Sequence, residues 1–163
     1  MSVWTDPNGL RATVVGYAIS KTYTVATETA TLFNVSGLVL VTGIVGKVTT
    51  AMTVANTIKL QANPTTGTSS DLCAATDLGT TDTPAGDLIT LSGAPTAAPT
   101  VGIGAVQVGG TAKVGTDYLG GGGQWYIAAG TIQQVTTGTG PDGVIVWTVT
   151  YVPIETDAAV TAA

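Results

Sequence analysis

Charged residues, histidine and cysteine are scarce in this sequence. Its 163 residues contain no His, one Cys, and five Lys plus Arg against ten Asp plus Glu, a formal net charge of −5. Without histidine there is no imidazole general base, no histidine metal ligand and no Ser-His-Asp relay. A single cysteine excludes an intrachain disulfide and a thiolate zinc site. Five scattered basic residues on an acidic chain argue against a nucleic-acid partner.

Apolar runs of the kind that cross membranes are also missing. Residues 88–112 carry no charge, but they include Pro95, Pro99 and five glycines and have no sustained Leu/Ile run. Residues 1–10 have neither the basic start nor the apolar segment of a secretory signal. We therefore expect no membrane partner.

Threonine, glycine, alanine and valine make up more than half of the chain. β-Branched residues lose rotamer freedom in a helix but fit a pleated sheet. Strong helix formers are few, and no window of a dozen residues has apolar positions at i, i+3, i+4 and i+7. The composition therefore predicts an all-β fold.

About ten short strands are expected, separated by turns rich in Gly, Pro, Asn and Asp. They are residues 12–20, 22–25, 29–35, 38–49, 55–62, 87–91, 102–108, 124–128, 131–136 and 144–152. Gly43 and Gly46 interrupt one of them and predict a bulge, or a bend at which the strand changes sheets. This spacing is typical of an antiparallel β-sandwich; a jelly roll and other sandwich topologies remain alternatives. A short helical turn is expected at 70–75 and a surface loop at 76–86.

One domain with extended terminal segments is expected at this length. Residues 1–10 form an N-terminal arm, 11–155 the β-sandwich with a possible linker at 93–100, and 156–163 a C-terminal tail. All of the net charge lies from Asp82 onward. We therefore expect the second half to supply most of the solvent-facing surface and the first half to supply more of the contacts.

No catalytic, cofactor-binding or metal-binding motif emerges from the reactive side chains. The glycine run at 120–123 leads into a predicted strand without a nearby basic residue, which favours a hairpin loop over a phosphate cradle. Cys73 lacks a histidine base and is expected to be a small buried residue. A calcium site or a hydrolase with paired acids stays an alternative. We expect solvated turn residues at the four regularly spaced aspartates, Asp71, Asp77, Asp82 and Asp87.

The large aromatic residues point to structural roles. Trp147 shares one face of strand 144–152 with Ile145, Val149 and Tyr151, which predicts core packing. Trp4 lies near the start of the chain and is expected to pack onto another subunit or the domain edge. A Leu38→Asp or Val41→Asp change is expected to abolish folding or assembly. The predicted interface residues are Trp4, Leu38, Val41 and Trp125.

Three segments resemble structural proteins of tailed bacteriophages, and the likeness covers most of the chain outside its middle. They are residues 31–50 (TLFNVSGLVLVTGIVGKVTT), 57–67 with 71–73, and the end of the chain at 129–133 and 143–153 (GVIVWTVTYVP). The resemblance implies a non-enzymatic virion protein, most like a capsid decoration (head accessory) protein. Such a protein is β-rich, has no cofactor, forms a homotrimer and binds the major capsid protein on the capsid exterior.

The composition agrees with that implication, because the cores of protein interfaces are depleted in Lys, Glu and Asp, and only 9% of this chain is charged. The alternative function is a tail-tip or fibre module that binds host-surface glycan. That function requires an exposed aromatic residue, such as Trp125 or Tyr126, beside turn aspartates.

Overall fold

The computed structural model describes residues 16–91, 96–102 and 124–163, which form twelve strands in two antiparallel sheets. Sheet A has the order β1-β11-β3-β7-β8, with β9 also paired to β3. Its strands are β1 (Tyr17–Thr24), β3 (Val39–Thr50), β7 (Leu88–Thr90), β8 (Thr100–Gly102), β9 (Trp125–Ile127) and β11 (Val144–Pro153).

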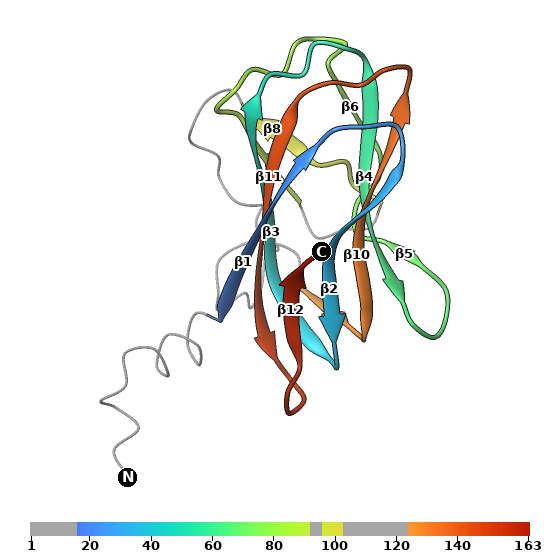
Figure 1. Cartoon of the computed structure of the whole chain (residues 1–163), viewed down its shortest axis with the longest axis vertical. Helices are drawn as coiled ribbons and strands as arrows, with labels where there is room; N and C mark the ends of the chain where they lie inside the picture. The colour runs from blue at the N-terminus through green and yellow to red at the C-terminus, as the bar shows by residue number, and fades with distance from the viewer. Residues whose placement is uncertain (1–15, 92–95, 103–123) are drawn as a thin grey trace, which may run out of the picture.

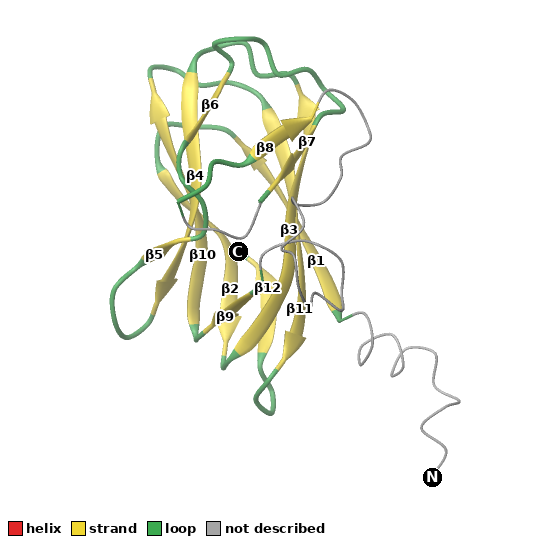
Figure 2. Ribbon diagram, turned by 180° about the vertical axis from the view of Figure 1, so that it is seen from behind, coloured by secondary structure: helices red, strands yellow, loops and turns green. Residues whose placement is uncertain are grey.

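Sheet B has the order β12-β2-β10-β4-β5, with β6 also paired to β4. Its strands are β2 (Thr29–Ser36), β4 (Asn56–Pro64), β5 (Ser70–Asp71), β6 (Thr76–Leu78), β10 (Gly130–Gly138) and β12 (Ala159–Ala162). Figure 1 shows the two layers edge-on, with the long strands of sheet A to the left of those of sheet B, and Figure 2 shows them from behind. The all-β prediction and the antiparallel sandwich are confirmed, whereas this strand order does not confirm a jelly roll.

The core lies between the sheets and is built by strict alternation along the strands. Successive strand side chains point to opposite faces. Ile145, Trp147 and Val149 of β11 are therefore fully buried, as are Ile58 and Leu60 of β4. The expectation that Trp147 belongs to the core is confirmed.

The bulge predicted in the 38–49 segment is confirmed beside Gly43. Thr150 lies opposite Gly43 but Tyr151 lies opposite Val41, so β3 carries one extra residue there. The predicted change of sheets is wrong, because β3 stays in sheet A along its whole length. Gly46 serves a different purpose: a Cβ built there would lie 2.8 Å from the Trp147 ring, closer than real Cβ contacts come.

Residues 156–163 do not form a free tail, which corrects the sequence prediction. Ala159–Ala162 form β12 and pair with β2, with Val160 opposite Val35. Val160 is buried against the core, so one apolar side chain and the backbone hydrogen bonds hold this strand in place. The segment consists mostly of small residues, so its sequence lacks the alternation of apolar and polar side chains that predicts a strand.

The segments expected as a helical turn and a loop are also strands in part. Ser70–Asp71 form β5 and Thr76–Leu78 form β6, both paired with β4. Between them, the Leu72 N–H donates to the Leu60 carbonyl at 2.8 Å. Pairing with β4 satisfies backbone groups that a helical turn at 70–75 would have satisfied internally.

Both halves of the sequence contribute strands to both sheets. The central strands of sheet A, β11 and β3, come from opposite halves, and so do β10 and β4 in sheet B. Within the predicted linker, Ala97 accepts a hydrogen bond from the Ala74 N–H at 3.0 Å and Thr100 begins β8. Residues 1–10, with Trp4, and residues 120–123 lie outside the described part of the chain.

In the described ranges, no helix is long and apolar enough to span a bilayer.

Candidate binding surfaces

The outer face of sheet A is nearly uncharged. On its three long strands, β1, β11 and β3, outward positions alternate with inward ones, and Lys47 is the one charged residue among the outward positions. Ser20 and Thr148 are hydrogen-bonded at 2.8 Å across this face. We call it the neutral face; its members are Ala18, Ser20, Thr22, Leu40, Thr42, Val45, Lys47, Val146, Thr148, Thr150 and Val152.

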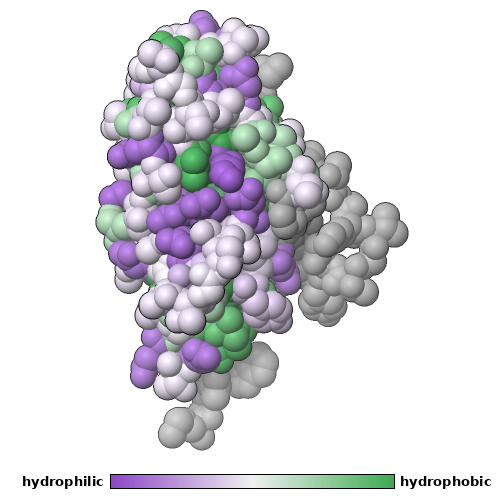
Figure 3. Space-filling model, turned by 90° about the vertical axis from the view of Figure 1, so that its right-hand side faces the viewer, coloured by the Kyte–Doolittle hydropathy of each residue, from purple (hydrophilic) through white to green (hydrophobic). Residues whose placement is uncertain are grey.

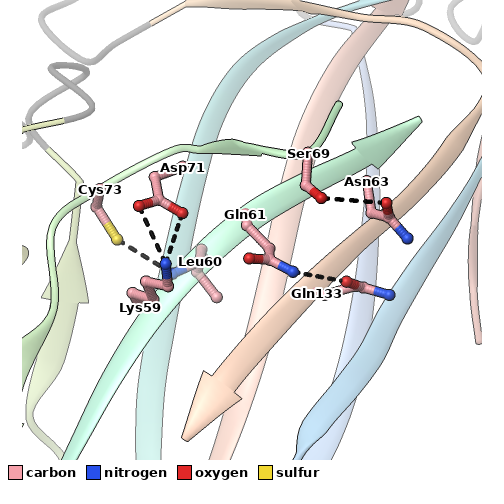
Figure 4. A network of polar contacts seen from close by, with 8 residues as sticks. All are labelled: Lys59, Leu60, Gln61, Asn63, Ser69, Asp71, Cys73 and Gln133. Carbon is pink, nitrogen blue, oxygen red and sulfur yellow. Dashed lines mark hydrogen bonds and ion pairs between the residues drawn. The ribbon is translucent and has the colours of Figure 1, made fainter. Parts of the chain in front are cut away.

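The outer face of sheet B is polar, and its side chains pair with one another. Gln61 Nε2 donates to Gln133 Oε1 at 2.9 Å, and Lys59 Nζ lies 2.8 Å from Asp71 Oδ1 (Figure 4). Figure 3 looks onto this side of the molecule and shows a band of hydrophilic side chains across its middle. We call it the polar face; its members are Thr29, Thr31, Asn34, Thr57, Lys59, Gln61, Asn63, Asp71, Thr131, Gln133, Val135 and Thr137.

A hollow of about 310 Å³ lies between the edge strand β9 of sheet A and the β4–β5 hairpin of sheet B. Tyr126 of β9 is 71% exposed and lines it. The Thr65 N–H donates to the Ala129 carbonyl at 2.8 Å, which ties the hairpin to the segment after β9. The lining residues, none of them charged, are Ala62, Pro64, Thr66, Gly67, Thr68, Ser70, Tyr126, Ile127 and Ala128.

A buried polar chain crosses the centre of the sandwich. Trp147 Nε1 donates to Gln134 Oε1 at 2.7 Å, and Gln134 Nε2 donates to Thr136 Oγ1 at 2.8 Å. Gln134 is fully buried, so these bonds replace the water that its amide loses on folding. These hydrogen-bonded side chains stabilise the fold, and they are too buried to offer a reactive atom to a substrate.

Cys73 is a buried residue, as the sequence predicted. Its Sγ accepts a hydrogen bond from the Leu60 N–H at 3.2 Å (Figure 4). Burial raises the pKa of the thiol, which keeps it protonated and a poor nucleophile at neutral pH.

The four regularly spaced aspartates do not converge on one site. Across the described ranges, no three Cys, Asp or Glu side chains are grouped to hold a metal ion. Asp71 pairs with Lys59, and Asp82 is exposed in a loop. Asp87 is only 4% exposed, which corrects the expectation that all four are solvated.

The predicted interface residues occupy different environments. Val41 is fully buried in the core, so it supports the fold and cannot contact a partner. Leu38 is half-buried before β3, where its N–H donates to Glu155 Oε2 at 2.8 Å and its carbonyl accepts from the Ile154 N–H. Trp125 points inward and packs against the core, and its indole Nε1 is buried without a hydrogen-bond partner. The exposed aromatic residue is its neighbour Tyr126.

Asp142 has a role that the sequence reading missed. Its carboxylate accepts hydrogen bonds from the Val54 and Thr53 N–H groups at 3.0 and 2.9 Å, and from Thr53 Oγ1 at 2.7 Å. The bond from Val54, followed by those from Thr53, lowers the pKa of Asp142 below its ordinary value of 3.8. The sequence gives no local signal for this role, because the donors come from a segment almost ninety positions away.

We expect the Asp142→Ala variant to have a lower Tm than the wild type at pH 7. Because the folded pKa is depressed, the carboxylate stabilises the fold fully above its unfolded pKa, and this contribution is lost as the pH falls through the folded value. The Tm difference should therefore shrink in thermal scans as the pH falls below the ordinary value of 3.8. Asp82→Ala, which removes an exposed loop carboxylate, is the matched control, and its Tm at pH 7 should stay close to that of the wild type. A constant difference at all pH values would contradict the role assigned to the carboxylate.

Comparison of the chain with protein-family models, with curated proteins and with solved structures gave no match.

Proposed function

We propose that this protein is a non-enzymatic structural component of a bacteriophage virion. In this proposal it binds the capsid exterior as a homotrimeric decoration protein, contacts the major capsid protein and stabilises the contacts between capsomers. The sequence resemblance motivates the proposal, and the neutral face of sheet A is the structural observation that carries it.

The contrast between the two outer faces supports the choice of surface. The polar face carries the Lys59–Asp71 ion pair and the Gln61–Gln133 hydrogen bond, so its side chains already satisfy one another in water. The neutral face offers hydroxyl, methyl and isopropyl groups with one lysine, and it shares with interface cores the depletion in charged residues. Short side chains also lose little rotamer freedom when a partner covers them. The neutral face is therefore the surface that we assign to assembly.

Two valines provide a matched test of this assignment. Val146 on the neutral face lies between Thr22 and Lys47, and Val135 on the polar face lies between Thr29 and Lys59. Both are half-buried, outward-pointing residues of inner strands. We expect Val146→Glu to weaken self-association at least about tenfold, because a carboxylate would lose its water at the interface, and Val135→Glu to leave it unchanged.

Size-exclusion chromatography with light scattering measures this effect, and the wild type should elute at three times the 16.2-kDa chain mass. Thermal scans of both variants check that each is folded. A wild-type monomer at micromolar concentration, or equal loss of assembly in both variants, would contradict the assignment.

The location in the virion is tested on particles purified from the producing phage. Mass spectrometry should detect the chain in the particles, and cryo-electron microscopy should place its density on the outside of the capsid. Its absence from purified particles would overturn the proposed function, and density on the tail would move it to the alternative location.

A further inference from the structure

The hollow beside Tyr126 has the chemistry of a ligand site, separate from the assembly role proposed above. We propose that it binds a short neutral saccharide, with one sugar ring against Tyr126 and its hydroxyl groups on the β4–β5 hairpin. The proposal goes beyond the assembly function and does not depend on it, since self-association tests the neutral face and glycan binding tests the hollow.

Tyr126 is the most exposed aromatic residue in the described part of the chain. At 71% exposed it contrasts with Phe33 and Trp147, which are fully buried, and with Tyr23 and Tyr151 on the inner face. A tyrosine ring offers an apolar surface together with a hydroxyl at its tip. This combination suits a sugar ring, which presents C–H groups on one face and hydroxyls around its rim.

The facing wall supplies the polar partners. Thr66, Thr68 and Ser70 line the hollow and are exposed. Each hydroxyl can both donate and accept a hydrogen bond, as a sugar hydroxyl can. Gly67 and Ala128 add little bulk, so the wall stays open to a ring-shaped ligand.

The uncharged lining of the hollow favours a neutral ligand. Within the described part of the chain, no Lys, Arg, Asp or Glu lines it, and Asp71, the residue after Ser70, is already paired with Lys59. A phosphate or a sialic acid would find no cation among the lining residues, and an amine would find no free carboxylate. The volume of about 310 Å³ is at the lower end of the range for small-molecule sites, about 300–1,000 Å³, which indicates a short saccharide segment.

The walls are held in place before any ligand arrives. Gly130 begins β10 opposite Pro64, and a Cβ built on Gly130 would lie 2.3 Å from the Asn63 carbonyl oxygen, so the two backbones are in close contact. The Thr65–Ala129 hydrogen bond adds a second tie across the same junction. A peptide is a poorer occupant, since β9 offers an edge of only three residues for strand addition.

The first experiment is an array of neutral and acidic glycans, followed by NMR titration of the folded protein with maltohexaose, chitohexaose and the strongest array hits. We expect binding to neutral glycans with a dissociation constant of about a millimolar, since the hollow is open and few groups converge on it. No binding to any neutral glycan at 10 mM, or a preference for acidic glycans, would overturn the proposal.

Three variants locate the site. Tyr126→Ala should weaken binding at least tenfold, and Ala128→Phe should do the same by filling the hollow while keeping the Tyr126 ring. Tyr17→Ala is the matched control, because Tyr17 is a 48% exposed tyrosine at the end of another strand of sheet A. Binding that survives both site variants, or that Tyr17→Ala abolishes equally, would contradict the assignment. Light scattering of the same variants shows whether assembly is unaffected, which separates this test from that of the proposed function.

Discussion

The Val41→Asp variant should fail to fold, whereas Leu40→Asp, one position earlier, should fold. Val41 is fully buried between Tyr151 of β11 and Trp125 of β9. An unpaired carboxylate there would cost several kcal/mol, a large share of the roughly 5–15 kcal/mol that stabilises a domain. Far-UV circular dichroism and thermal scans should show no cooperative transition for Val41→Asp.

Leu40 is the control for this prediction, because the alternation of β3 places it on the neutral face. Its carboxylate variant keeps the charge in water while the protein is monomeric, so a cooperative unfolding transition should remain. If Val41→Asp unfolds with a Tm close to that of the wild type, the inward orientation of Val41 is wrong. If both variants fail to fold, the outward orientation of Leu40 is wrong.

The second large effect is expected at Trp147. We expect Trp147→Ala to reduce the free energy of unfolding by about 3–5 kcal/mol, because it leaves a large cavity between the sheets. For a chain of this size the loss corresponds to a fall in Tm of roughly 10 °C or more. Urea denaturation followed by circular dichroism measures the change directly.

Trp147→Phe separates the ring from its N–H group. It keeps an aromatic ring but leaves Gln134 Oε1, which accepts from Trp147 Nε1 at 2.7 Å, without its donor. We expect a loss of about 1–3 kcal/mol for this unpaired buried oxygen in addition to the smaller ring. In the double variant Trp147→Phe/Gln134→Leu, part of that loss should be recovered. A double variant whose loss equals the sum of the two single losses would show that the hydrogen bond contributes little.

The fold class and most strands could be predicted because alternation is a local property. Ile58 and Leu60 against Lys59 and Gln61, and the four inward residues of β11, mark strands without reference to any partner. The last strand could not be found in this way. Val160 is its only large apolar residue, and β12 exists because β2 offers it a free edge.

The hollow and the Asp142 contacts depend on long-range pairing, which a single sequence does not encode visibly. Tyr126 meets the hairpin of residues 64–70 only because β10 pairs with β4 and β9 pairs with β3. Of the two aromatic residues that the sequence offered for an exposed position, Tyr126 is exposed and Trp125 packs against the core. Which of the two faces solvent depended on their register against Val41 and Leu40.

The pairing of β1 affects how the chain reaches its fold. Among the described strands, β1 pairs only with β11, so the ladder hydrogen bonds of Tyr17 form only after Tyr151, near the other end of the sequence, has been synthesised. Contacts this far apart in sequence slow folding, because the chain loses the conformational entropy of closing a long loop before the contact contributes any stabilising free energy. During synthesis on the ribosome, an unpaired β1 would present eight residues of strand edge to other chains. Chaperone cover of this segment until β11 has been synthesised would therefore improve the yield of folded protein.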